Sequence, residues 1–267
     1  MTPIVMTIAG SDSSGGAGIQ ADLKTFSALG VYGASVITAV TAQNTLTVSA
    51  IHAIPTHLIK AQIETVLSDL KVNAIKIGML ANKEIIQCVA DCLVDCRIPL
   101  IIDPVMIAKS GDTLLTEDSI DTLRRKLLPQ AELLTPNLPE AAKLLNRPVA
   151  ENMATIIEQG KRLCDMGSNA VLMKGGHARG ENCHDYLINA NQEDEYHEYV
   201  AERVHTSNTH GTGCTLSAAI AAGLALGLNL PQATNEAIAF VQKAINCADL
   251  LSIGSGHGPV HHFHGFW

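Results

Sequence analysis

Short apolar runs alternate with amphipathic stretches along most of the chain. The runs at Ala74–Ile77 and Leu100–Ile102 have the length and composition of buried strands. Between such runs, apolar residues recur at three- and four-residue spacing, which predicts helices. Alternating buried strands and helices favour a mostly parallel sheet with right-handed crossovers. The hydrophobic pattern therefore predicts a doubly wound α/β fold.

The expected elements can be placed along the sequence. Strands are expected at residues 4–9, 34–41, 74–77, 100–102, 133–135 and 170–173, and helices at 19–29, 56–70, 83–96, 117–128, 154–166, 211–226 and 232–251. Two polar segments, 184–189 and 195–204, are expected to pair antiparallel near an edge. Because no linker, repeat or low-complexity tract divides the sequence, we expect a single domain over residues 1–267.

Composition narrows the class of protein. The chain has 267 residues, of which 47% are hydrophobic and 16% charged, which is typical of one large enzyme-like α/β core. A net charge of -8 and only 3% aromatic residues disfavour nucleic acid as a partner. The start lacks the features of a signal peptide, and no apolar run reaches membrane-spanning length, so we expect a cytoplasmic protein without a membrane partner. Seven cysteines, an odd number, fit reduced thiols.

A glycine- and serine-rich segment, residues 10–18, lies where the first strand turns into the first helix. Ligands bind at such turns in open α/β folds. The segment begins like a Walker A loop, but Gly16 and Ala17 stand where that motif requires Lys and Ser or Thr. It also fits a relaxed dinucleotide pattern, yet no acidic residue follows at the required distance. A flexible turn is the alternative, and the position favours a ligand-facing role.

The segment Asn-Thr-His-Gly-Thr-Gly-Cys, residues 208–214, directly precedes a helix rich in small residues. Its two glycines allow backbone N–H groups to converge, and the helix N-terminus adds positive potential, so the segment suits a transferring phosphoryl group. At this helix start we expect a lowered pKa for Cys214, which could then take a proton from an acceptor hydroxyl. A capped helix with a buried cysteine is the alternative.

Seven short segments in this order resemble the hydroxymethylpyrimidine kinases, which are members of the ribokinase-like superfamily. They are Ala-Gly-Ser-Asp at 9–12 continuing to Gly-Ile-Gln-Ala-Asp at 18–22, Thr-Ala-Gln-Asn at 41–44, Lys-Ile-Gly-Met at 76–79, Asp-Pro-Val-Met at 103–106, Thr-Pro-Asn at 135–137 with Glu140, Lys-Gly-Gly-His at 174–177, and His-Gly-Thr-Gly-Cys at 210–214. The resemblance spans the chain and implies a three-layer α/β/α sandwich with a mostly parallel central sheet, commonly a homodimer.

The resemblance also implies catalytic residues. Cys214 would be the base, and Gly211, Thr212 and Gly213 would form the anion hole. Lys174 would face the phosphates of ATP. Taken alone, Lys174 could equally be an ordinary lysine at a strand end.

Magnesium is the second cofactor that the resemblance implies. Asn137 and Glu140 match the Asn-x-x-Glu element that organises Mg²⁺ beside the phosphates, and Asp103 lies in the same polar zone. A hard cation held by few carboxylates and by phosphate oxygens suits magnesium. Alternatively, Glu140 only stabilises a helix start, where the helix dipole favours a negative charge.

A further set of residues would bind the pyrimidine. Gln43 would read its aminopyrimidine edge, because an amide presents both a donor and an acceptor, and Asp22 would be a second polar contact. The Gln43 amide could instead only form hydrogen bonds with the backbone of its own loop. The other expected pocket residues are Gly10, Met79, Val105 and His210.

The implied activity is ATP-dependent phosphorylation of 4-amino-5-hydroxymethyl-2-methylpyrimidine to its monophosphate and then to its diphosphate, in thiamine biosynthesis. Related sugar and pyridoxal kinases usually place aspartate where this chain has Cys214. A fixed carboxylate would repel an acceptor that already carries phosphate, at a cost of about 1 to 4 kcal/mol at roughly 4 Å. We hypothesise that a neutral thiol lets one site perform both steps.

Two other functions stay open from sequence. A pyridoxal kinase is the nearer alternative, although Gln43 and Met79 favour a pyrimidine, and a non-catalytic vitamin sensor of the same fold is the other. Two further clusters could suggest metal sites. Cys88, Cys92 and Cys96 suit a helix face packed on the sheet, and the tail histidines fit a structural or pocket-closing role; these are His257, His261, His262 and His264.

Overall fold

The computed structural model describes residues 2–106, 115–176, 180–190 and 196–267. The strands are β1 (Ile4–Asp12), β2 (Tyr32–Gln43), β3 (Val48–Ala53), β4 (Ala74–Ile77), β5 (Leu100–Ile102), β6 (Leu133–Leu134), β7 (Ala170–Met173), β8 (Asn182–Asn189) and β9 (Tyr196–Glu202). The helices are α1 (Gly18–Ala28), α2 (Thr56–Asp69), α3 (Lys83–Leu93), α4 (Glu117–Thr122), α5 (Leu138–Leu145), α6 (Met153–Asp165), α7 (Thr212–Ala225) and α8 (Leu230–Asn246).

Within the described residues, the strands form one sheet in the order β3-β2-β1-β4-β5-β6-β7-β8-β9. The six strands from β2 to β7 in that order run parallel, whereas β3, β8 and β9 pair antiparallel at the two ends. The chain leaves β1 in one direction along the sheet to form β2 and later returns to the other side of β1 as β4. The resulting switch point at the carboxyl ends of β1 and β4 is where open α/β sheets bind ligands.

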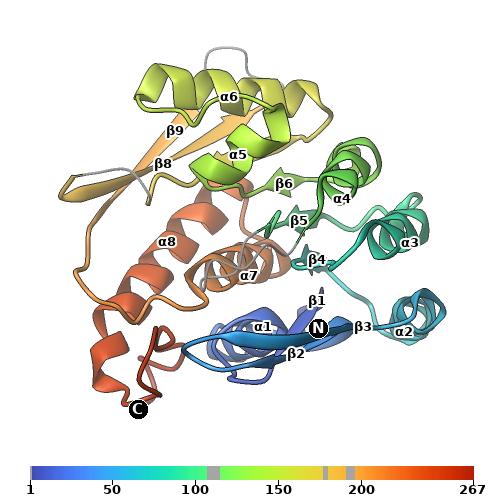
Figure 1. The fold of residues 1–267 in the computed structure, drawn as a ribbon, viewed down its shortest axis with the longest axis horizontal. Helices are drawn as coiled ribbons and strands as arrows, with labels where there is room; N and C mark the ends of the chain where they lie inside the picture. Colours follow the sequence, from blue (N-terminus) through green and yellow to red (C-terminus); the bar gives the residue numbers. More distant parts are fainter. Residues whose placement is uncertain (1, 107–114, 177–179, 191–195) are drawn as a thin grey trace.

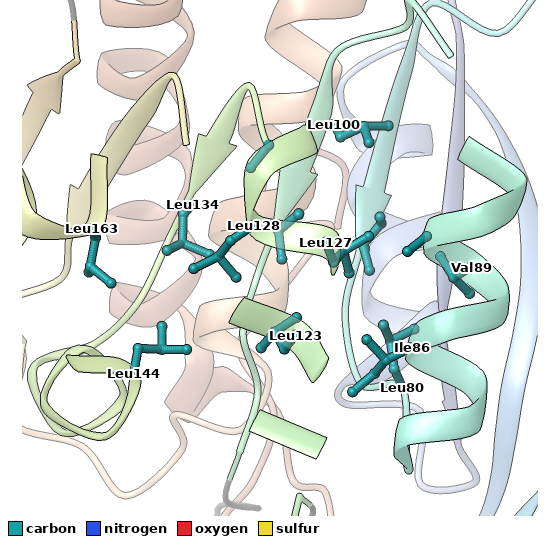
Figure 2. Close-up of a cluster of buried hydrophobic side chains, with 14 of the residues drawn as sticks. Leu80, Ile86, Val89, Leu100, Leu123, Leu127, Leu128, Leu134, Leu144 and Leu163 are labelled. Atoms are coloured by element: carbon teal, nitrogen blue, oxygen red, sulfur yellow. The ribbon is translucent and has the colours of Figure 1, made fainter. Parts of the chain in front are cut away.

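Helices cover both faces of the sheet (Figure 1), which confirms the predicted three-layer α/β/α sandwich with a mostly parallel sheet. Successive side chains of each strand point to opposite faces of the sheet, so a separate hydrophobic core forms on each face. In β4, Ile75 and Ile77 face the core shared with α2 and α3, whereas Ala74 faces the core shared with α1, α7 and α8. Figure 2 shows the first core, where Leu127 and Leu128 point toward side chains of the sheet and of α3.

The sequence pattern located most elements. β4, β5 and β7 have the expected bounds, and β8 and β9 pair antiparallel at an edge as expected. The edge strand β3 and the helix α5 were not predicted. The helix expected at 117–128 is α-helical only over α4, and its next turn, Leu123–Leu127, is π-helical. Residue 195 and His177 of the quoted motif lie outside the described residues.

A buried ion pair fixes α1 against the sheet. The Lys76 Nζ atom on β4 lies 2.9 Å from both carboxylate oxygens of Asp22 on α1, and both side chains are 0% exposed. The Thr7 hydroxyl on β1 donates a hydrogen bond of 2.6 Å to the same carboxylate. The pair links α1 to β4, and loss of either partner would leave a buried charge uncompensated, which is strongly destabilising.

Replacing Asp22 by Ala leaves the Lys76 ammonium buried without a counterion. We expect Asp22→Ala to lower the free energy of unfolding by about 3–5 kcal/mol in urea denaturation. The double variant Asp22→Leu/Lys76→Met should regain most of this loss. Glu64→Ala is the matched control, because its exposed pair with Lys60 should contribute less than about 0.5 kcal/mol. Equal effects of the two alanine variants would contradict the prediction.

Candidate active site

An open cavity of about 1360 Å³ lies at the carboxyl ends of the parallel strands. It reaches from the switch point between β1 and β4 to the region between β9 and α8. Every predicted site residue except Asp22 lines it, and these residues are Gly10, Gln43, Met79, Asp103, Val105, Asn137, Glu140, Lys174, His210, Gly211, Thr212, Gly213 and Cys214. The fold therefore brings together residues from both ends of the chain.

Two glycine-rich turns meet at one wall of the cavity. Gly211, with φ of +83°, precedes α7, and any side chain there would collide with the backbone oxygen of Gly16. A side chain at Gly18, where φ is +56°, would collide with the backbone oxygen of Gly10. Both positions need a left-handed backbone and close approach, which only glycine combines without strain. The segment 10–18 thus packs directly on the predicted anion hole.

Cys214 lies in the first turn of α7, facing the cavity. Burial raises the pKa of its thiol to about 11, with Asp22 and Asp103 acting in the same direction against the opposing charge of Lys76 and a hydrogen bond from the Gly18 backbone. The expectation of a lowered pKa is therefore wrong. The physical reason is that the burial of the thiol outweighs the charge of Lys76 and the hydrogen bond from Gly18. Near neutral pH, Cys214 is a neutral thiol.

Lys174, directly after β7, lines the cavity. Its Nζ atom lies 3.0 Å from Oδ1 of Asp103, which follows β5, and both side chains are largely buried. Burial opposes the charge on Lys174, but Asp103 and Glu140 outweigh it and raise the pKa of its ammonium group. A Cβ atom at Gly213 would come 3.5 Å from this Nζ, so the ammonium group lies at the start of α7. This places a permanent cation beside the predicted anion hole.

Asn137 and Glu140 form a reciprocal cap at the start of α5. The Asn137 side chain accepts the Glu140 N–H at 2.8 Å, and Glu140 Oε2 accepts the Asn137 N–H at 2.8 Å. The alternative role of Glu140 at a helix start is thus present in the structure. Burial raises the pKa of Glu140 to about 7, which Asp103 reinforces and Lys174 opposes.

The donor set fits a magnesium ion that arrives with phosphate. Asp103 and Glu140 are two buried carboxylates that share one neighbouring ammonium group, so a divalent cation would relieve excess negative charge. In the described part of the chain, no group of three or more His, Cys, Asp and Glu side chains could hold a metal ion. Mg²⁺ usually keeps waters and substrate phosphates among its ligands, which such an incomplete set allows.

The residues expected to bind the pyrimidine divide into two groups. Gly10, Met79 and Val105 line the cavity near the switch point, where the Met79 sulfur would be 3.3 Å from a Cβ at Gly10. Gln43 and His210 also line it, with 3.4 Å between their Nε2 atoms. Asp22 is the exception, because its fully buried carboxylate is bound to Lys76 and Thr7. The expected contact between Asp22 and substrate is not supported by this position.

Sequence reasoning missed Asp12 and Lys76. Asp12 accepts hydrogen bonds from Ser14, Gly16 and Ala17 and lies 2.8 Å from His210. Lys76, at the end of β4, lines the cavity although it is fully buried. A charged residue inside an otherwise apolar strand was the available signal for Lys76, since such a charge needs a partner.

Several members of the remaining candidate clusters make packing contacts. Cys88 and Cys92 are half-buried on α3, and the Cys88 thiol contacts the Thr56 backbone oxygen. His261 and His262 are buried, and His262 lies 3.0 Å from the Thr215 hydroxyl of α7. Among the described residues, no helix is sufficiently long and apolar to cross a bilayer.

Comparison with known proteins shows which family this chain is similar to. The family model described as phosphomethylpyrimidine kinase matches residues 12–261. The hydroxymethylpyrimidine/phosphomethylpyrimidine kinases of Rhizobium meliloti and Escherichia coli are each 51% identical to this chain; the alignments cover 100% and 98% of it and 99% and 98% of the relatives.

Solved structures agree on the fold. A pyridoxal kinase from Bacillus subtilis in complex with ADP superposes with a TM-score of 0.90 at 34% identity, covering 98% of both chains. A phosphomethylpyrimidine kinase from Clostridium difficile 630 superposes with a TM-score of 0.80 at 43% identity, covering 91% of this chain and 99% of that one. With a family model spanning nearly its whole length and full-length relatives at 51% identity, this chain belongs to the phosphomethylpyrimidine kinase family.

Proposed function

We propose that this protein transfers a phosphoryl group from ATP to 4-amino-5-hydroxymethyl-2-methylpyrimidine and a second one to the resulting monophosphate, in thiamine biosynthesis. The supporting observation is the convergence of Lys174, Cys214 and the Gly211–Gly213 turn on one cavity. Relatives at 51% identity carry the name of this activity. Assembly as a homodimer and a cytoplasmic location stay predictions from the sequence.

The start of α7 and Lys174 would stabilise the transferring group. Backbone N–H groups at a helix N-terminus favour anions, and the nearby Lys174 ammonium adds a full positive charge. Gly213 has no side chain between this ammonium group and the turn, so a phosphoryl group can contact both. Asp103 and Glu140 would hold a magnesium ion, which would supply charge neutralisation at the phosphates.

The far end of the cavity suits the nucleobase of ATP. Val204 follows β9, and Ile238 and Val241 lie on α8; all three line this end. Apolar side chains are the usual lining of a site for a flat ring. This arrangement leaves the switch-point end, with Gln43 and Met79, for the acceptor.

Cys214 would take the proton from the acceptor hydroxyl. Only the thiolate can do so, and with a pKa of about 11 it is a small fraction near neutral pH. In the neutral form, the thiol exerts no charge repulsion on an acceptor that already carries phosphate. The raised pKa therefore supports the hypothesis that one site performs both steps.

Pyridoxal phosphorylation is the second candidate activity. Pyridoxal kinases from Bacillus subtilis and Staphylococcus aureus superpose with TM-scores of 0.90. Their identities of 34% and 32% are lower than the 51% of the pyrimidine kinases, which favours the pyrimidine.

Turnover of both candidate substrates tests the proposal. The purified protein is incubated with MgATP and either hydroxymethylpyrimidine or pyridoxal, and the products are followed by mass spectrometry. We expect the pyrimidine monophosphate and then the diphosphate to appear in sequence. Pyridoxal phosphate as the sole product would transfer the assignment to pyridoxal kinase, and no product from either would favour a sensor.

The pH dependence of the rate tests the role of Cys214. Because its raised pKa makes the thiolate more abundant as pH rises, kcat should increase by about tenfold per unit between pH 7 and pH 9. Cys214→Ala should lower kcat about 10²- to 10⁴-fold and remove this slope. Unchanged kcat and slope in the variant would show that another group is the base.

Cys214→Asp tests whether the neutral thiol permits the second step. An ionised aspartate at roughly 4 Å would cost a phosphorylated acceptor about 1 to 4 kcal/mol. The ratio of the second rate to the first should therefore fall at least about fivefold. Rates are measured separately, starting from the alcohol and from the monophosphate. A variant with an unchanged ratio would be incompatible with the hypothesis.

A further inference from the structure

The Asp12 carboxylate joins the first glycine-rich turn to the wall that carries His210. Its Oδ1 accepts hydrogen bonds from the N–H and the hydroxyl of Ser14 at 2.8 and 2.7 Å. Its Oδ2 accepts the N–H groups of Gly16 and Ala17 at 3.1 and 2.8 Å and lies 2.8 Å from His210 Nε2. Burial opposes ionisation, yet these hydrogen bonds lower the pKa of Asp12 to about 2. The carboxylate is therefore charged throughout the physiological range.

A charged carboxylate only accepts hydrogen bonds, so His210 must donate to Asp12. The donating atom is Nε2, which carries a hydrogen in the neutral Nε2–H tautomer and in the imidazolium ion alike. His210 therefore donates from Nε2 in either of its charge states. In neither state does Nε2 have a lone pair with which to accept a hydrogen bond.

This constraint extends to Gln43. Its Nε2 lies 3.4 Å from His210 Nε2, and two N–H donors would face each other across that contact. Its Oε1 lies 3.2 Å from the Thr41 hydroxyl, which can give its single hydrogen to the Ser11 backbone oxygen at 3.0 Å. Exchanging the amide O and N by a half-turn resolves the conflict. Gln43 Oε1 then faces His210, and one amide hydrogen goes to Thr41.

We propose that Asp12 fixes the tautomer of His210 and, through it, the orientation of the Gln43 amide that reads the acceptor ring. In this orientation, the second amide hydrogen of Gln43 remains for a ligand in the cavity. A ring nitrogen with a lone pair, as in an aminopyrimidine, accepts it; a ring N–H, as in the 4-oxo analogue, presents a second donor. Asp12 and His210 are thus positioning residues for specificity, an inference that rests on the proposed function.

The tautomer can be measured without turnover. In protein carrying ¹⁵N-labelled histidine, long-range ¹H–¹⁵N spectra distinguish a protonated Nε2 from an unprotonated one, and His210→Gln identifies the resonance. We expect His210 Nε2 to carry a hydrogen from pH 6 to pH 8. In Asp12→Asn, whose amide can itself donate, we expect the Nδ1–H tautomer to appear. An unprotonated Nε2 in the unaltered protein would overturn the proposal.

Gln43→Glu tests the consequence for specificity and leaves Asp12 in place. A carboxylate at position 43 can still accept from His210, so the fold and the KM for ATP should be preserved. It cannot donate to a ring nitrogen but can accept from a ring N–H. The ratio of kcat/KM for the amino substrate to that for its 4-oxo analogue should therefore fall about tenfold or more.

The two measurements separate this inference from the proposed function. An unchanged kcat/KM ratio in Gln43→Glu, with both substrates turned over, would refute the orientation of Gln43. If neither pyrimidine is a substrate while the tautomer shifts as expected, the proposed function fails and the link between Asp12 and His210 stands. Asp12→Asn could unfold the turn, but the spectrum of the unaltered protein and the Gln43→Glu variant decide the proposal without it.

Discussion

The contact between two glycine-rich turns is the constraint on which the active-site cavity depends. Gly211 packs so closely on Gly16 that no side chain fits between their backbones. The ionised Asp12 holds the same two turns together through His210. Residues that would otherwise belong to opposite ends of the chain thereby form one wall. The proposed acceptor end of the cavity, the predicted anion hole and Cys214 all lie along or beside this wall.

Burial, more than local sequence, determines the electrostatics of the site. Lys76 and Asp22 form a fully buried ion pair, and Lys174 is paired with Asp103 and has Glu140 as a second neighbouring carboxylate. The same exclusion of water keeps Cys214 protonated. A neutral thiol adds no charge repulsion of its own toward an acceptor that already carries phosphate, whereas a fixed carboxylate at the same position would.

Much of this structure could be predicted from the sequence, and the failures have physical causes. β5 and β7 are continuous apolar runs and β4 is apolar except for Lys76, so the bounds of these three strands follow from hydrophobicity. The helix α5 was not predicted from the sequence, because Asn137 and Glu140 were interpreted as a ligand motif although they also match a capping box at a helix start. The pKa of Cys214 depends on how deeply the folded protein buries the thiol. The partner of Asp12, His210, lies 198 residues away in the sequence. Neither the burial of a side chain nor a contact between distant residues can be predicted from the local spacing of residues.

A crystal structure with hydroxymethylpyrimidine and a non-hydrolysable ATP analogue bound together would show whether the proposed catalytic residues meet the reacting groups. We predict that the acceptor hydroxyl lies within hydrogen-bonding distance of the Cys214 thiol, with the terminal phosphate between Lys174 and the Gly211–Gly213 turn. The ring should lie beside Gln43. A pyrimidine bound away from Cys214, or a terminal phosphate remote from the start of α7, would contradict the account.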